Sequence, residues 1–179
     1  MTNERYILVD ICWTLFYSNT TYDFLHIRGN RFNSLLFKFF GCDIVRSRAI
    51  RRFRQLPEEE QAARAERFYT DYLVPRKIEP VWQMIQGRPV VLVSHTMDII
   101  AETVARHIGA KAYHSLPDKQ EVLTLYNDYD IITDNLTDIE LIRHAKSATV
   151  ITYNNRERWQ KILPRDINVT FIDATERRY

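Results

Sequence analysis

The sequence predicts an α/β protein with a parallel sheet flanked by helices, because short apolar runs alternate with helical patterns. The runs are Tyr6–Val9, Val90–Val93, Ile131–Thr133, Val150–Thr152 and Val169–Ile172. Their near-continuous apolar character is typical of strands covered on both faces. Amphipathic patterns over Asp98–His107, which is followed by Gly109, and over Thr137–Ala145 predict intervening helices. Such alternation favours an open, Rossmann-like sheet with right-handed crossovers.

Residues 17–86 interrupt this alternation and predict a small all-helical cap inserted after the first strand. One helix face is formed by Phe32, Leu35, Leu36, Phe39 and Phe40. A second helix is expected to start near Pro57, with carboxylates at Glu58–Glu60 favoured by the helix dipole, and to continue through Leu73. The predicted division is a core of residues 1–16 and 87–179 and a cap of residues 17–86.

The composition is that of a soluble globular protein with one domain and a modest insertion. The chain has 179 residues, of which 45% are apolar and 27% charged, which excludes collagen-like and disordered classes. No secretory signal is visible at the N-terminus, and no apolar run reaches the ~20 residues of a spanning helix. Cys12 and Cys42 match neither a disulfide framework nor a zinc pattern. A cytoplasmic location is therefore expected.

Positive charge is concentrated between residues 28 and 54, although the net charge is only +2. This stretch has one acid, Asp43, and eight basic residues: Arg28, Arg31, Lys38, Arg46, Arg48, Arg51, Arg52 and Arg54. Such a charge attracts an anionic substrate, a nucleic acid or an acidic membrane surface, and the alternative is a solvated basic face. No nucleic-acid-binding motif accompanies it, so no specific nucleic acid is expected, while peripheral membrane contact stays open.

Polar side chains follow three of the predicted strands, at Asp10, Ser94 and Asp134. A lone aspartate there is also a common turn residue, but in open α/β sheets the ligand crevice lies outside the carboxyl ends of the strands. Lys119 adds a cation. An aspartate that attacks a phosphoryl group needs positive charge, which Mg²⁺ held by two carboxylates supplies, and hydroxyl and ammonium donors fix the transferring oxygens. The set therefore indicates phosphoryl transfer.

Four segments together resemble the haloacid dehalogenase superfamily. YILVDICWTLF, from Tyr6, is similar to its first motif, Asp-x-Asp-x-Thr-Leu after an apolar strand. VVLVSHT resembles the second motif, Lys119 the third, and IITDNLTDIELI the fourth. The motifs occur in the family's order, and the helical insertion, with the wording LPEEEQAARAERFYTDYLVPR, resembles the C1 cap of the phosphoserine-phosphatase-like branch.

This resemblance implies a Rossmann-like hydrolase core, Mg²⁺ as cofactor, a small phosphorylated substrate and an aspartyl-phosphate intermediate. Carried over, Asp10 would be the nucleophile, Thr14 would steady its loop, and Ser94 and Lys119 would bind phosphate, with His95 beside them. The metal would be held by Asp10, the backbone carbonyl of Cys12 and Asp134, with Asp138 in support.

Three departures accompany the resemblance. Thr133 stands where the family commonly has glycine, and Lys119 and Asp134 are only 15 positions apart. The largest departure is Cys12, in place of the aspartate that protonates the leaving oxygen and activates water. General acid–base help of this kind is worth ~10²–10⁴ in rate, and a thiol with a pKa of ~8.5 is a poor substitute.

Cys12 leaves four readings open. The first is a phosphatase whose proton is not needed or comes from His95 or His114, although a lone loop histidine is more often structural. The second is a dehalogenase. The phosphoserine-phosphatase-like cap argues against it, and so does the retained Asp134, because dehalogenation needs no Mg²⁺. The third is a phosphotransferase or slow phosphatase with a long-lived aspartyl phosphate. The fourth is a non-catalytic binding module, against which the joint presence of the motif residues argues.

Aromatic residues crowd the predicted cap, and most are expected to form its own core. Phe37 lies off the apolar face of the first cap helix, and arginines follow it. A basic, aromatic cap would suit a phosphorylated sugar or a phosphate presented near a membrane.

Overall fold

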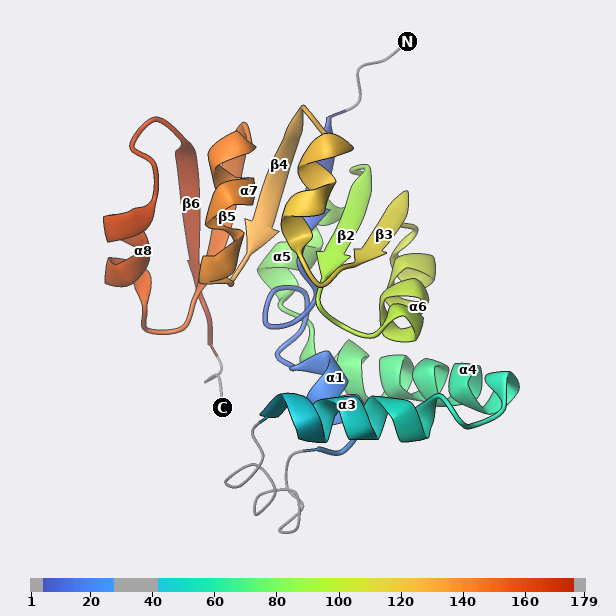
Figure 1. Cartoon of the computed structure of the whole chain (residues 1–179). Coiled ribbons are helices and arrows are strands. Elements are labelled where there is room, and N and C mark those ends of the chain that lie inside the picture. The colour runs from blue at the N-terminus through green and yellow to red at the C-terminus, as the bar shows by residue number, and fades with distance from the viewer. Residues whose placement is uncertain (1–4, 28–41, 176–179) are drawn as a thin grey trace.

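The computed structural model describes residues 5–27 and 42–175, which contain one six-stranded parallel sheet (Figure 1). Its strands are β1 (Tyr6–Val9), β2 (Val90–Ser94), β3 (Ala112–Ser115), β4 (Tyr129–Thr133), β5 (Ser147–Thr152) and β6 (Asn168–Asp173). They are ordered β3-β2-β1-β4-β5-β6, so β1 lies between β2 and β4. The α/β fold class expected from the sequence is confirmed.

Helices cover both faces of this sheet. The helices described are α1 (Thr20–Phe24), α3 (Cys42–Phe53), α4 (Glu58–Arg67), α5 (Glu79–Ile85), α6 (Asp98–Ile108), α7 (Ile139–His144) and α8 (Arg156–Ile162), of which α6 packs on one face of the sheet and α7 and α8 on the other. Shorter turns are the π-helical Phe68–Leu73 and the 3₁₀ turns Val74–Arg76, Lys119–Thr124 and Leu136–Asp138. None of the helices described is both long and apolar enough to cross a membrane.

Alternation along the strands divides the core between the two faces. In β1, Ile7 and Val9 join a cluster that includes Val104 of α6, whereas Leu8 joins a second cluster with Ile142 of α7 and Trp159 of α8. Successive side chains of a strand point to opposite faces, and here both faces are apolar. This double burial explains why the strands read as continuous apolar runs in the sequence.

All five expected strands are present, and the sequence missed β3. This edge strand is short and polar, AYHS, with none of its residues fully buried. The expected helix from Pro57 to Leu73 is α4 with Pro57 at its N-cap, continued by the π-helical turn. The expected helix over Phe32–Phe40 lies outside the described residues. Within the described part of the chain, helices, turns and isolated bridges at Cys12, Phe16 and Lys77 lie between β1 and β2, while the division at residues 16 and 86 stays a prediction.

The two segments that join the helical insertion to the core are hydrogen-bonded to each other. The amide of Tyr17 donates to the carbonyl of Arg76 over 2.8 Å, and the amide of Ile78 donates to the carbonyl of Leu15 over 3.0 Å. The indole Nε1 of Trp82 donates to the same Leu15 carbonyl over 3.0 Å. The outgoing and returning chains are therefore fixed side by side at the end of the sheet toward which the strands point, where α1, α3 and α4 lie (Figure 1).

Gly109 ends α6 in the left-handed conformation, with φ of 67°, as the sequence predicted for a helix stop. No atom lies within 4 Å of the position that a Cβ would occupy, so Gly109→Ala changes only backbone strain. We expect it to lower the free energy of unfolding by about 1 kcal/mol, measured by urea denaturation. Gly109→Asn is the matched control, because asparagine tolerates this conformation better, and equal losses in both variants would contradict the explanation.

Candidate functional site

Two aspartates meet at the carboxyl ends of the neighbouring strands β1 and β4. Asp10 directly follows β1, and its amide donates to the carbonyl of Ile132 over 3.0 Å. Asp134 directly follows β4. Their exposed fractions are only 6% and 2%. The parallel pairing of β1 with β4 therefore brings together two acids that are 124 positions apart in the sequence.

Lys119 is the buried cation of this site. It begins the 3₁₀ turn Lys119–Thr124 and is only 4% exposed. Its Nζ lies 2.8 Å from Oδ2 of Asp10 and 2.9 Å from Oδ2 of Asp138. Burial alone would lower the pKa of this ammonium, but the two carboxylates outweigh it and raise the pKa above its ordinary value. The side chain therefore stays charged and joins the ends of β1 and β4.

Thr133, the last residue of β4, hydrogen-bonds within the site. Its Oγ1 donates to Oδ2 of Asp138 over 2.6 Å, and the amide of Asn135 donates to Thr133 Oγ1 over 3.0 Å. Burial raises the pKa of Asp138, and the ion pair with Lys119 offsets this only in part. Thr133 thus compensates part of the cost of burying that carboxylate.

Thr14 anchors the loop after β1 to the end of β4. Its fully buried hydroxyl donates to Oδ1 of Asp134 over 3.2 Å. Trp13, beside it, has φ of 57° and a carbonyl that accepts from the hydroxyl of Tyr153 over 2.8 Å. A non-glycine residue at positive φ persists only where surrounding contacts hold it. The loop that carries Asp10 is therefore held in one conformation from two sides.

Cys12 faces a threonine network that the sequence analysis did not identify. Its Sγ lies 3.1 Å from Oγ1 of Thr20 at the start of α1, and Thr20 Oγ1 lies 2.6 Å from Oγ1 of Thr96. Thr21 Oγ1 also reaches Thr96, over 3.2 Å. Burial, and then the charge of Asp10, raise the pKa of the Cys12 thiol to about 11. The network links the loop after β1, helix α1 and the loop after β2.

Ser94 ends β2, is 1% exposed, and its Oγ accepts from the amide of Thr96 over 3.4 Å. His95 follows it, with its ring Nδ1 2.7 Å from the carbonyl of Leu116. The carbonyl of His95 accepts from Nη2 of Arg46 in α3 over 2.8 Å. The residue after β2 thus contacts both the segment before Lys119 and helix α3.

His114 lies in the edge strand β3. Its Nε2 is 3.0 Å from the hydroxyl of Tyr126, whose ring packs on Tyr6 at the amino end of β1. Burial lowers the pKa of this imidazole. His114 pairs with Val93 of β2 and so lies level with the carboxyl ends of the strands, but β2 separates its strand from β1. Its ring nitrogen is engaged by Tyr126, so its geometry does not favour a role as proton donor in place of Cys12.

The donor set at the strand ends fits a hard divalent cation. No three His, Cys, Asp or Glu side chains of residues 5–27 and 42–175 converge to hold an ion by themselves. The metal site expected from the sequence needs only two side-chain ligands, the carboxylates of Asp10 and Asp134, together with the backbone carbonyl of Cys12. Mg²⁺ prefers such oxygen ligands along with water. Asp10, Asp134 and Asp138 are all buried with one ammonium, which leaves excess negative charge that a cation would neutralise.

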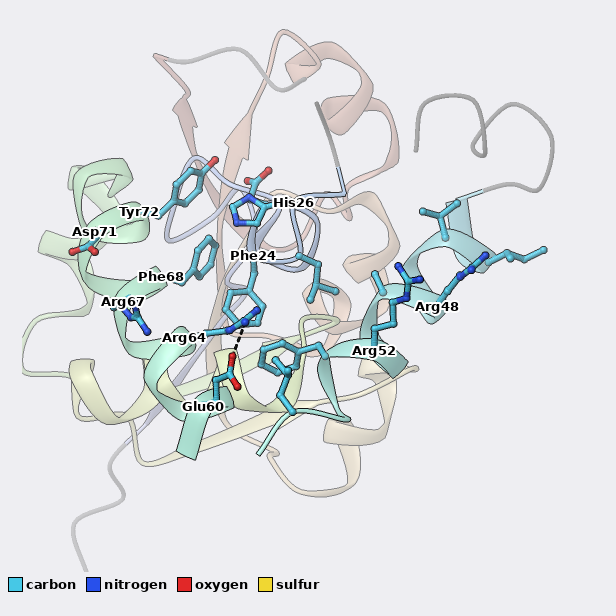
Figure 2. A pocket seen from close by; sticks show the side chains of 17 residues that line it. Phe24, His26, Arg48, Arg52, Glu60, Arg64, Arg67, Phe68, Asp71 and Tyr72 are labelled. Atoms are coloured by element: carbon cyan, nitrogen blue, oxygen red, sulfur yellow. Dashed lines mark hydrogen bonds and ion pairs between the residues drawn. The ribbon is translucent and has the colours of Figure 1, made fainter. Parts of the chain in front are cut away.

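A cavity of about 1330 Å³ lies apart from this site, among α1, α3 and α4 (Figure 2). None of the residues that the sequence assigned to catalysis, phosphate or metal lines it. The buried acids at the strand ends and this cavity are therefore two separate features of the described residues.

Replacing Lys119 by methionine would leave the carboxylates of Asp10 and Asp138 without their ammonium. We expect Lys119→Met to lower the free energy of unfolding by about 3–5 kcal/mol at pH 7 in EDTA, measured by urea denaturation. The loss should shrink toward pH 5, because a buried carboxyl with a raised pKa binds a proton more readily in the folded state. Lys111→Met, at an exposed position, is the control and should change stability by less than about 0.5 kcal/mol. Equal effects of the two variants would contradict the assigned role.

No protein-family model and no curated protein matches this sequence, but solved structures do. A protein of unknown function from Bordetella pertussis Tohama I has a TM-score of 0.60 at 17% identity, covering 94% of this chain and 98% of that one. A phosphoserine phosphohydrolase-like protein from Francisella tularensis subsp. tularensis SCHU S4 has a TM-score of 0.56 at 13% identity, covering 93% and 94%. An L-2-haloacid dehalogenase has a TM-score of 0.50 at 13% identity, covering 97% and 96%. The chain therefore has the haloacid dehalogenase-like fold that its motifs imply.

Proposed function

We propose that this protein is a Mg²⁺-dependent phosphomonoester hydrolase that uses Asp10 as nucleophile. The observation that carries the proposal is the buried Lys119 ammonium, 2.8 Å from Asp10 and 2.9 Å from Asp138 at the carboxyl edge of the sheet. A carboxylate that attacks a phosphoryl dianion needs adjacent positive charge, and a buried ammonium provides it where water cannot screen it.

The proposed reaction has two displacements at phosphorus. In the first, an oxygen of Asp10 bonds to phosphorus as the bond to the leaving oxygen breaks, giving an aspartyl phosphate and an alcohol that takes up a proton. In the second, water attacks phosphorus, loses a proton and restores the Asp10 carboxylate with release of phosphate. Ser94, His95 and Lys119 bind the phosphoryl oxygens, and Thr14 holds the loop after β1 through Asp134.

Asp10, Asp134 and the backbone carbonyl of Cys12 are the residues that would hold Mg²⁺, with Asp138 in support through Lys119. When bound, the ion supplies positive charge that offsets repulsion between the nucleophile and the phosphoryl group. Loading should also be visible without turnover, because the ion relieves the buried negative charge of these acids.

The second candidate function is a slow phosphatase or a phosphotransferase, and Cys12 is the residue that favours it. A thiol is mostly protonated at neutral pH, so it donates a proton weakly and rarely has the deprotonated form that would activate water. The second displacement is therefore the step that suffers most. Aspartyl phosphate would then accumulate and decay slowly, or pass its phosphoryl group to an acceptor other than water.

The dehalogenase alternative makes a different demand on the same aspartate, which would attack carbon instead of phosphorus. Among its structural relatives the chain has both a dehalogenase and a phosphohydrolase-like protein, so the shared fold does not separate the two. The buried acids Asp10, Asp134 and Asp138 favour the phosphatase. Their charge would be neutralised by Mg²⁺, which attack on carbon does not need. The non-catalytic reading predicts the same ion binding without turnover.

A screen of phosphate esters that includes phosphorylated sugars, run with Mg²⁺ and with EDTA, tests the proposal. We expect phosphate release by the wild type with Mg²⁺ and none by Asp10→Asn, because an amide is not a nucleophile for phosphorus. We also expect Mg²⁺ to raise the melting temperature of the wild type and to affect Asp134→Asn much less. Activity that survives Asp10→Asn would refute the nucleophile assignment, and chloride release from 2-chloroacids would favour the dehalogenase. Mg²⁺ binding without any turnover would favour a binding module.

Cys12→Asp tests the proton-transfer argument. We expect this variant to turn over faster than the wild type, by up to ~10²–10⁴, because a carboxylate supplies the missing acid–base group. The wild type should show a burst of alcohol release followed by a slow phase, while Cys12→Asp should lose the burst. Cys12→Ser is the size-matched control and should not gain activity. Equal rates for Cys12→Asp and Cys12→Ser would contradict the argument.

A further inference from the structure

The cavity among α1, α3 and α4 has an aromatic interior. Phe24 of α1 has its ring centroid 4.9 Å from that of Phe53 and 5.1 Å from that of Phe68, and Phe68 stacks on Tyr72 at 5.0 Å. All four rings line the cavity. Its volume, about 1330 Å³, exceeds the ~300–1,000 Å³ of typical small-molecule pockets. Charged side chains also line it, among them Asp23, Glu60 and Asp71, so the space suits an amphiphilic molecule with an apolar part.

Arginines border this interior from two helices. Arg48 and Arg52 come from α3, and Arg64 and Arg67 from α4 (Figure 2). Arg64 forms an ion pair with Glu60, with 2.6 Å between Nη2 and Oε1. Arg48 and Arg52 form no ion pair with any residue that the structure describes, and both are exposed. Because they are four positions apart, their guanidinium groups lie on one helix face, where one anionic group can contact both.

The surface of α3 beyond the cavity has the same character. Arg51 is exposed, and Ile44 is 58% exposed. Ile44, Arg48 and Arg51 line a second, shallow hollow. From residue 44 to residue 56 the chain has five arginines and no acid. Two of these arginines are engaged, Arg46 with the carbonyl of His95 and Arg54 with Asp98, whereas Arg48 and Arg51 form no ion pair within residues 5–27 and 42–175. An exposed isoleucine beside such arginines matches an anionic, amphiphilic surface.

We propose that the helical cap binds an anionic lipid, with an acyl chain in the aromatic cavity and the headgroup against Arg48 and Arg52. The charge of the two arginines complements a phosphate-bearing headgroup, and the cavity directly behind them accommodates the chain. A nucleic acid would use the same cations and would stack its bases on aromatic rings, but the exposed Ile44 beside Arg48 favours an amphiphilic surface over a nucleic acid. The proposal does not depend on turnover at Asp10.

Co-sedimentation with vesicles tests the headgroup contact, in EDTA so that no metal-dependent step contributes. We expect the wild type to bind vesicles of equal phosphatidylcholine and phosphatidylglycerol and not vesicles of phosphatidylcholine alone. Arg48→Glu/Arg52→Glu should weaken this binding at least about tenfold. Arg158→Glu/Lys161→Glu on α8 makes the same charge change at exposed positions far from the cavity in sequence, and it should bind like the wild type. Equal weakening by both double variants would overturn the proposal, because net charge alone would then explain binding.

Lysophosphatidylglycerol below its micellar concentration tests the chain contact, with glycerol 3-phosphate as the headgroup without a chain. We expect lysophosphatidylglycerol to bind and raise the melting temperature of the protein, and glycerol 3-phosphate to change that temperature little. Ala49→Phe, at a lining position, should fill part of the cavity and weaken lysolipid binding several-fold while the protein stays folded by circular dichroism. Unchanged lysolipid binding in Ala49→Phe would overturn the cavity assignment. Binding of single-stranded DNA without any binding of vesicles would assign the arginines to a nucleic acid instead.

Discussion

The ion pairs of Lys119 with Asp10 and Asp138 are the interaction on which this site depends. Two buried carboxylates at adjacent strand ends repel each other, and the low polarity around them makes the repulsion costly. One ammonium between them converts that cost into a link between the loop after β1 and the turn after β4. The same charge is what a phosphoryl group would meet on entering, so folding and the proposed chemistry use one side chain.

Much of this site could be predicted from the sequence because strand ends carry a local signature. Asp10, Ser94 and Asp134 each follow an apolar run, and parallel strands bring such positions to one edge. The threonine network could not be predicted in this way. Thr20 and Thr96 are 76 positions apart, and a threonine at the start of a helix ordinarily indicates only a cap. Strand β3 was missed for a related reason, since an edge strand of four partly exposed residues lacks the apolar run.

Cys12 also changes the charge balance of the site. With an aspartate at this position, four carboxylates would share the neighbourhood of one ammonium, whereas the thiol is neutral at its raised pKa. The hydrogen bond to Thr20 keeps the side chain in place all the same. The site therefore retains the position from which an acid–base group would act while carrying less buried charge. At position 12, the thiol thus favours stability without metal, whereas a carboxylate would favour fast proton transfer.

The hydrophobic cluster on the α6 face of the sheet does not stop at the base of the insertion. It runs from Ile7 and Val9 of β1 through Phe16 to Phe24, Phe53 and Tyr69 among the helices beyond the sheet. Groups that share one packed interior lose their contacts together when any part opens. The helical insertion and the sheet should accordingly unfold as one cooperative unit, and a ligand bound among the cap helices would stabilise the strands that carry Asp10 and Asp134.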